Sequence, residues 1–374
     1  MDWKDKRIHY LSPYALILTG IVMAGMAQAQ VPADIEAGLR KIGQIVDPPC
    51  TAKLYRLLMP ANDINSNVTP LYPGITIARD VSFGAHPKDL VDIFTADKGN
   101  GNRTVFIYIP GGAGNKIEQQ DREANAFYDN IGRWATKNGM VAVLMQRHPG
   151  QNWDDPAKDV SAMLAWVEAN IGKYKGNPDR MFIAAHSAGN GPLGTYIGRP
   201  EVWGPKGVGV KGAIFISGQW NIAPLEVPGG RGGGGRGGAG NPLAGMGSSC
   251  GVDPNSTAGF INGPSRSDSR AAPAPAGRGG APDAATQMSR STLPEFKNST
   301  VKMMFISAEL DPGINGSMSA FYQTLHDELC KQGPDHCPTM LLAKDESHMS
   351  EVFSFDTADK TVSGPILAWI KKMK

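Results

Sequence analysis

Residues 179–191 read Asp-Arg-Met-Phe-Ile-Ala-Ala-His-Ser-Ala-Gly-Asn-Gly, and this stretch decides the fold. Its residues 181–185 form a short apolar run of the kind that a buried parallel strand shows. Ser187 follows, with Ala185 two positions before it and Gly189 two positions after it. A strand that turns sharply into a helix at a serine needs small residues at both positions, because the backbones pass close together. The pattern predicts a nucleophile elbow; an ordinary strand-to-loop junction is the alternative.

Candidate partners for this serine follow downstream, each after a further strand-like run. Residues 301–307 are apolar and lead through Glu309 to Asp311, whose Asp-Pro-Gly turn would hold a carboxylate at a strand end. Residues 339–343 form another such run, and His348 comes soon after it. We therefore predict the elbow serine as nucleophile, the histidine as its base and the aspartate as the acid that orients the imidazole. The glutamate is the alternative acid.

A glycine-rich turn precedes the elbow. Residues 104–109 are a strand-like run, and Pro-Gly-Gly-Ala-Gly follows at residues 110–114. Backbone amides in such a turn can stabilise the negative oxygen of a tetrahedral intermediate. We expect the oxyanion hole to consist of the amide of Ala188 together with that of Gly111 or Gly112.

With these motifs in place, the chain resembles α/β-hydrolase esterases of the branch that contains hormone-sensitive-lipase-like carboxylesterases and kynurenine-formamidase-like enzymes. The resemblance covers residues 72–221 and 293–374, and includes Ile-Ser-Gly at residues 216–218. The chain departs from the family at Pro110, where the family has a loop-supporting histidine, but the two glycines after it still supply amide donors. The resemblance implies cleavage of carboxylic esters through an acyl-enzyme intermediate, without a cofactor.

Strand-like runs alternate with helix-like segments through this part of the chain. Residues 140–145 read as a strand, and Asp155 and Pro156 read as the start of the next helix. Such alternation predicts a mostly parallel central sheet with helices on both faces, the α/β-hydrolase fold.

Other residues near these strand ends are candidates for the substrate pocket. His148 follows residues 140–145, so we expect it to line the pocket or to be structural. Ala113 and Trp220 are further pocket candidates. His186 stands beside the serine, and its side chain should point away from the hydroxyl.

The first 71 residues divide into two segments. Residues 1–29 read as an export signal, with a basic front, an apolar run and a small-x-small pattern at its end. An uncleaved membrane anchor is the alternative. We expect an exported protein, periplasmic or secreted. Residues 30–71 read as a helical extension in which Asp-Pro-Pro at residues 47–49 stops the first helix and residues 54–59 form a second. The extension either packs at the mouth of the site or covers the edge of the sheet.

The hydrolase domain spans residues 72–374 and is interrupted by an insert at residues 222–292. The insert is rich in Gly, Pro, Ala and Arg, so it can bury little apolar area and should be flexible, beside or over the mouth of the site. Arg-Gly-Gly runs also occur in RNA-binding tails, but Phe260 is the insert's one aromatic residue.

The charge balance does not point to a polyanionic partner. The chain has 37 basic and 35 acidic residues, so neither nucleic acid nor a membrane surface is expected as a partner. We expect a small-molecule ester as substrate and no stable membrane insertion. The sequence makes no prediction about the oligomeric state.

Four cysteines follow the predicted signal, and four allow three pairings. Cys330 and Cys337 flank a short loop, so we predict that they form a bridge, worth about 2 to 3 kcal/mol. Cys50 then pairs with Cys250 by elimination. His336 stands beside one of these cysteines, but no second cluster at ligand spacing accompanies it, so no metal site is expected.

Two other functions are compatible with these features. An amide-cleaving relative, a formamidase or a peptidase, would use the same three residues. A non-catalytic binding protein with a hydrolase fold would be marked by the loss of one of them, and none is missing.

Overall fold

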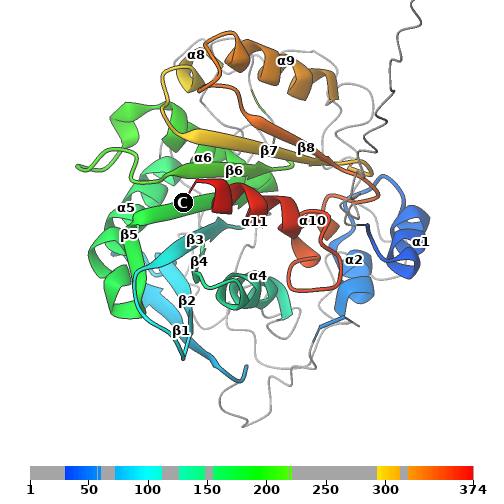
Figure 1. Cartoon of the computed structure of the whole chain (residues 1–374), viewed down its shortest axis with the longest axis horizontal. Coiled ribbons are helices and arrows are strands. Elements are labelled where there is room, and N and C mark those ends of the chain that lie inside the picture. Colours follow the sequence, from blue (N-terminus) through cyan, green and yellow to red (C-terminus); the bar gives the residue numbers. More distant parts are fainter. Residues whose placement is uncertain are drawn as a thin grey trace, which may run out of the picture.

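One mixed sheet forms the centre of the described structure (Figure 1). The computed structural model describes residues 30–56, 58–59, 72–111, 126–147, 155–218, 220, 293–311 and 319–373. Strands β2 and β4 pair antiparallel, as do β1 and β2, whereas the remaining pairs are parallel. The predicted α/β-hydrolase fold is confirmed. The eight described strands lie in the order β1 (Ile75–Ser82), β2 (Leu90–Ala96), β4 (Val141–Met145), β3 (Arg103–Ile109), β5 (Gly176–His186), β6 (Gly212–Ile216), β7 (Lys302–Ala308) and β8 (Thr339–Ala343).

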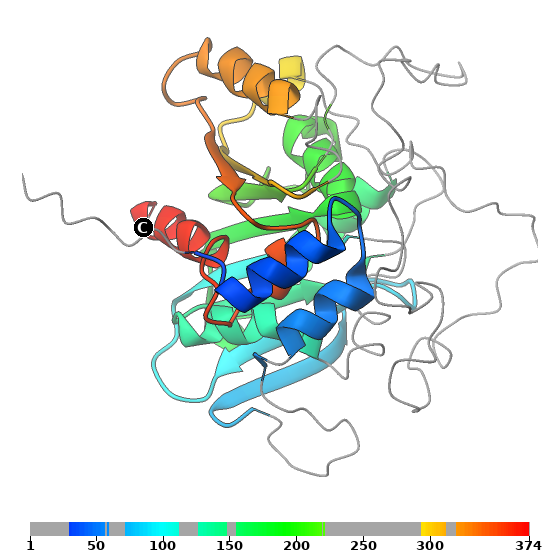
Figure 2. The ribbon, with the colours of Figure 1, turned by 90° about the vertical axis from the view of Figure 1, so that its right-hand side faces the viewer.

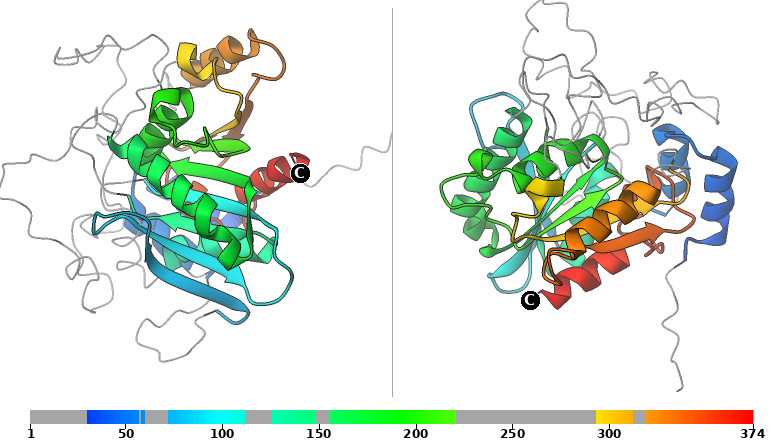
Figure 3. Two further views of the ribbon diagram at one scale, coloured as in Figure 1. Left: turned by 90° about the vertical axis from the view of Figure 1, so that its left-hand side faces the viewer. Right: turned by 90° about the horizontal axis from the view of Figure 1, so that it is seen from above.

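Side chains of the central strands alternate between two apolar layers. On β3, Phe106 and Tyr108 belong to one layer, and Ile107 and Ile109 to the other. Both faces are covered by helices, which is why these strands read as continuous apolar runs in the sequence. Figure 3 shows the sheet between its two groups of helices. One layer contains α4 (Ala126–Lys137), α10 (Ser350–Phe353) and α11 (Ser363–Lys372); the other contains α5 (Asp155–Asn170), α6 (Asn190–Gly198), α8 (Leu293–Phe296) and α9 (Ser319–Cys330).

The N-terminal extension forms two helices, α1 (Ala33–Ile42) and α2 (Pro48–Arg56), which lie side by side near α10 (Figure 2). The predicted bounds of the second helix, residues 54–59, were wrong, because α2 begins at Pro48. The two prolines open α2, and α1 has already ended at Ile42. Proline lacks an amide hydrogen, and the first helical turn leaves that hydrogen unpaired in any case. Asp47 completes the start of the helix, since its carboxylate accepts the amide N–H of Cys50 at 3.0 Å.

Three of the described cysteines are in disulfides. The predicted bridge between Cys330, the last residue of α9, and Cys337, just before β8, is confirmed. Cys50 is also disulfide-bonded. Cys250 lies outside the described residues, so its pairing with Cys50 stays a prediction.

Several predicted features lie outside the described residues. These are the export signal at residues 1–29, the insert at residues 222–292, Gly112, Ala113 and His148. Among the helices that the structure describes, none is both long enough and apolar enough to cross a bilayer.

Candidate active site

Ser187 lies in a sharp turn between β5 and α6. Its φ is 50°, in the left-handed region that residues with a Cβ seldom adopt. The strand ends at His186, and a single 3-10 turn leads from the serine into the helix. A strained turn of this kind presents a serine hydroxyl at the carboxyl edge of the sheet. The chain therefore forms the elbow geometry that the sequence predicts.

Two glycines let the backbones pass close to the elbow. A Cβ on Gly111 would lie 2.6 Å from Cβ of Ser187 and 2.8 Å from the carbonyl oxygen of His186. A Cβ on Gly189 would lie 2.7 Å from the carbonyl oxygen of Pro110. Both positions are too close for a real Cβ, so a larger residue would push the end of β3 away from the elbow. The first glycine of the glycine-rich turn thus packs directly against the serine.

Three of the predicted site residues meet at this edge of the sheet. Nε2 of His348 lies 2.9 Å from Oγ of Ser187, and Nδ1 lies 2.5 Å from Oδ2 of Asp311. The side chains of the histidine and the aspartate are only 12% and 11% exposed, so their contact is largely shielded from water. When the carboxylate holds the proton on Nδ1, Nε2 is free to accept the proton of the hydroxyl. The arrangement can therefore convert the serine into a nucleophile.

Hydrogen bonds fasten the loop of the acid to the loop of the histidine. The amide of Leu310 donates to the carbonyl oxygen of Glu346 at 2.8 Å. The amide of Asp345 donates to the carboxylate of Glu309, also at 2.8 Å. Glu309, the alternative acid, thus binds the backbone of the histidine loop, whereas Asp311 is the carboxylate at the imidazole.

The side chain of His186 supports the backbone of His348. Nε2 of His186 lies 2.8 Å from the carbonyl oxygen of His348, and the two ring centroids are 4.8 Å apart. A carbonyl oxygen can only accept, so Nε2 carries the hydrogen. Burial, with a smaller effect of the neighbouring His348, lowers the pKa of His186 to about 3, and the ring is neutral at neutral pH. Sequence reasoning placed this residue beside the serine but did not foresee its partner.

A buried carboxyl group lies close enough to Asp311 to be affected by its charge. Glu351 on α10 is fully buried, and its Oε2 accepts a hydrogen bond from Oγ of Ser217 at 2.5 Å. Burial, and then the negative charge of Asp311, raise the pKa of Glu351 well above its usual range. Burial and the charge of Asp311 therefore favour the protonated, neutral form of Glu351 in the folded protein. Sequence reasoning missed it, because an isolated glutamate in a short helix forms no motif.

The N-terminal extension reaches the histidine loop. Tyr55 on α2 is fully buried, and its hydroxyl donates to Oδ2 of Asp359 at 2.8 Å and lies 3.4 Å from Oε2 of Glu346. On α1, Arg40 forms an ion pair with Asp345. These contacts place the extension against the loop that carries the proposed base, and its position at the mouth of the site or at the edge of the sheet stays a prediction.

Two further predicted site residues, Ala188 and Trp220, lie in parts of the chain that the structure describes. Ala188 lies in the 3-10 turn that begins at the serine. Trp220 is 4% exposed and packs edge-on against Phe215, Phe296 and Phe305, in an aromatic cluster of the core. Its role as a pocket residue stays a prediction.

A separate cavity of about 480 Å³ lies among β7, β8 and α11. Met340, Leu341 and Trp369 are among the residues that line it. None of the predicted site residues that the structure describes lines this cavity, so it is distinct from the elbow site.

Solved esterase structures resemble the chain over most of its length. A thermostable esterase from Pseudomonas putida gives a TM-score of 0.53 at 11% identity, covering 94% of this chain and 98% of that chain. The carboxyl esterase TmelEST2 of the fungus Tuber melanosporum gives 0.51 at 13% identity, covering 86% and 94%. At such low identities the likeness establishes the fold alone.

Sequence comparisons match the centre of the chain. Residues 91–198, from β2 through the elbow to the end of α6, match the family model BD-FAE. Over 94 residues the chain is 36% identical to a probable carboxylic ester hydrolase, LipM, of Mycobacterium tuberculosis. This match covers 24% of this chain and 20% of the relative, so the chain spans about a fifth of the length of that relative.

Proposed function

Because this chain is an α/β-hydrolase whose central segment matches carboxylesterases, we propose that it hydrolyses carboxylic esters with Ser187 as the nucleophile. The observation that supports the proposal most is the continuous contact from Oγ of Ser187 through the imidazole of His348 to the carboxylate of Asp311. A serine hydroxyl is a weak nucleophile on its own, and a histidine in contact with it supplies the base that it needs.

Acylation follows from the positions of these three groups. His348 takes the hydroxyl proton while Oγ of Ser187 attacks the ester carbonyl, and Asp311 stabilises the imidazolium. The imidazolium then gives its proton to the leaving alcohol, and the acyl group stays on the serine. In the second half of the reaction, the same imidazole removes a proton from the water that attacks the acyl group, and it returns this proton to Oγ of Ser187 as the acid product leaves.

The developing oxyanion needs donors on the side opposite the histidine. We assign this role to the amide of Ala188 and to that of Gly111 or Gly112. The close packing of Gly111 against Cβ of Ser187 supports the assignment of this glycine. One such donor contributes about 3 kcal/mol to lowering the barrier.

The protein is proposed to act outside the cytoplasm on small-molecule esters. The signal-like residues 1–29 support export, and the Cys330–Cys337 disulfide is of a kind that persists in oxidising compartments. The near balance of charge in the whole chain fits an uncharged small substrate.

Covalent labelling tests the proposed nucleophile. The purified protein should hydrolyse short-chain aryl esters and should be labelled by a fluorophosphonate at Ser187. Ser187→Ala should abolish labelling and lower kcat by about four to six orders of magnitude, whereas Ser82→Ala, in the edge strand β1, should leave both unchanged. Labelling of another serine, or full ester hydrolysis by Ser187→Ala, would refute the mechanism. Preferential cleavage of amides over matched esters would instead identify an amidase.

A further inference from the structure

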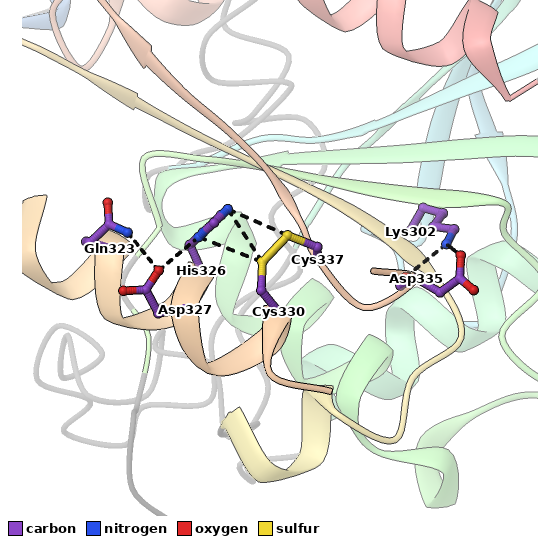
Figure 4. The surroundings of a disulfide bond; sticks show 7 residues. All are labelled: Lys302, Gln323, His326, Asp327, Cys330, Asp335 and Cys337. Atoms are coloured by element: carbon purple, nitrogen blue, oxygen red, sulfur yellow. Dashed lines mark hydrogen bonds and ion pairs between the residues drawn. A yellow bond between two sulfur atoms is a disulfide. The ribbon is translucent and has the colours of Figure 1, made fainter. Parts of the chain in front are cut away.

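Three side chains that can bind a metal ion gather at the C-terminal end of α9 (Figure 4). Nε2 of His326 lies 3.5 Å from Sγ of Cys330 and 3.7 Å from Sγ of Cys337. One ligand atom from each residue lies within 4.8 Å of the other two. The proposed ester hydrolysis uses none of these groups.

Local sequence explains how the cluster forms. His326 and Cys330 are one helical turn apart, so they share a face of α9. The helix ends at Cys330, and the loop that follows brings Cys337 back before β8 begins. Lys302 of β7 holds this loop through an ion pair with Asp335 at 2.9 Å (Figure 4). In the sequence, His336 stands out because it is next to Cys337, whereas His326 lies one helical turn before Cys330 and is easily missed.

A carboxylate orients the histidine ring toward the sulfurs. Oδ1 of Asp327 lies 3.1 Å from Nδ1 of His326, and Gln323 donates to the same oxygen at 2.8 Å. A carboxylate that accepts the hydrogen of Nδ1 leaves the lone pair of Nε2 available, and metal-binding histidines are usually oriented in this way. Nε2 is the nitrogen that lies within 3.7 Å of both sulfur atoms.

The cluster is accessible from solvent. The side chain of His326 is 33% exposed, and Cys337 is an exposed residue. A small reductant and a hydrated metal ion can therefore both reach the sulfur atoms. In the disulfide form the sulfurs are bonded to each other and are not thiolate ligands.

We propose that Cys330, Cys337 and His326 form a redox-gated site for a soft divalent metal ion, with Zn²⁺ as the best match. Two thiolates balance the charge of the ion, and the imidazole completes a donor set that favours zinc over magnesium or calcium. Three protein ligands leave the fourth tetrahedral position to water.

The two states of the site exchange in two balanced steps. A dithiol reductant passes two electrons and two protons to the disulfide, which becomes two thiols, and the reductant itself becomes a disulfide. The metal ion then displaces both thiol protons into solvent and binds the two thiolates and Nε2 of His326. Disulfide and metal ion exclude each other.

Cobalt(II) is a suitable spectroscopic probe for this site. We would reduce the disulfide to two thiols with a phosphine, which takes an oxygen atom from water and becomes the phosphine oxide. The reduced protein would then be titrated with Co²⁺ in the absence of oxygen. We expect thiolate-to-cobalt charge-transfer bands and tetrahedral d–d bands that saturate at one ion per chain, and their loss when Zn²⁺ is added. The oxidised protein should show neither. A Cys50→Ser/Cys250→Ser background leaves only the proposed ligands as thiols.

Variants separate this site from binding elsewhere. Cys330→Ser/Cys337→Ser should remove the charge-transfer bands, and His326→Ala should weaken Zn²⁺ binding by more than about tenfold, with Asp327→Ala weakening it by about tenfold. His336→Ala, a change in the same loop, is the matched control and should bind Zn²⁺ like the parent. Circular dichroism checks the fold of each variant.

Two outcomes would overturn the proposal. One is the absence of charge-transfer bands in the reduced parent protein. The other is unchanged Zn²⁺ affinity in His326→Ala. If the Cys50→Ser/Cys250→Ser background does not fold, the comparison of reduced wild-type protein with reduced Cys330→Ser/Cys337→Ser gives the same decision.

Discussion

The imidazole of His186 donates a hydrogen bond of 2.8 Å to the backbone carbonyl oxygen of His348. Ser187 and His348 are 161 residues apart in the sequence, yet the side chain next to the serine holds the backbone of the histidine. One buried ring therefore connects the backbone next to the proposed nucleophile with the backbone of its base. We call His186 a positioning residue, because its hydrogen bond is to the backbone of His348 and not to the imidazole that is the proposed base.

Removing this hydrogen bond should slow catalysis without weakening substrate binding. In His186→Ala, the loop of His348 loses its anchor, and a displacement of the imidazole by about 1 Å can cost about 100-fold in kcat. KM should change little. In His186→Gln, a side-chain N–H can reach the same carbonyl oxygen, so much of kcat should return. Steady-state kinetics with an aryl ester measures both values. Equal kcat in Ala, Gln and wild-type proteins would show that the ring does not position the base.

The same histidine should make the fold sensitive to acid. The pKa of His186 falls from an ordinary 6.5 to about 3 in the folded protein. Between these two pH values the histidine is therefore protonated in the unfolded chain but not in the folded chain. The stabilisation is complete above pH 6.5 and is lost as the pH falls toward 3, by up to about 1.4 kcal/mol per pH unit. Urea unfolding of wild type and His186→Gln between pH 7 and 4 should show a smaller acid loss in the variant. An equal loss of stability with falling pH in the two proteins would contradict the lowered pKa of His186.

Glu351 should have the opposite pH dependence. Its pKa is raised by burial, so the folded protein keeps a proton that the unfolded chain loses above its ordinary pKa of 4.5. The stabilisation is therefore complete below pH 4.5 and is lost as the pH rises toward the raised value. Glu351→Gln, which can still accept the hydrogen bond of Ser217, should match wild type near pH 4 and be more stable near pH 9.

An exposed glutamate provides the control for this comparison. Glu201, with a side chain that is 55% exposed, should give no pH-dependent gain when changed to Gln. Thermal or urea unfolding at the two pH values is the measurement. A Glu351→Gln protein that is less stable than wild type at pH 9 would mean that the carboxylate is ionised and bound in the folded state.

Tyr55→Phe should weaken both the fold and the histidine loop. The change leaves the buried carboxyl group of Asp359 without the phenol hydroxyl that donates to it, at a cost of about 1 to 3 kcal/mol. Since Glu346 of the histidine loop lies beside the same hydroxyl, kcat should fall as well.

Tyr196→Phe is the matched control for this change. Tyr196 is buried on α6 and its hydroxyl donates to a backbone carbonyl away from the histidine loop. It should lose stability but keep kcat. Guanidinium unfolding and aryl-ester kinetics on both variants test the link; identical kinetics would show that the extension only stabilises the fold.

Much of the fold was readable from the sequence because its signals are local. The apolar runs of β3, β5 and β7 mark strands that are buried on both faces, and a predicted site residue follows soon after each run. Ser187, Asp311 and His348 could be selected because the order of strand ends along the chain becomes an order in space in a parallel sheet. The Cys330–Cys337 bridge was readable for the same reason, since only a short loop separates the two residues.

Tertiary structure decided the features that depend on contacts between distant segments. His186 and Glu309 stand in motifs that the sequence displays, but their partners lie on the histidine loop, and no spacing predicts that. Packing buries Glu351 near Asp311 and so raises its pKa, whereas an isolated glutamate in a sequence reads as an exposed charge. The start of α2 at two prolines depended on the carboxylate of Asp47 binding an amide of the first turn. Sequence alone thus determined which residues end the strands, and the packing of loops and helices around those ends determined their partners and their charge.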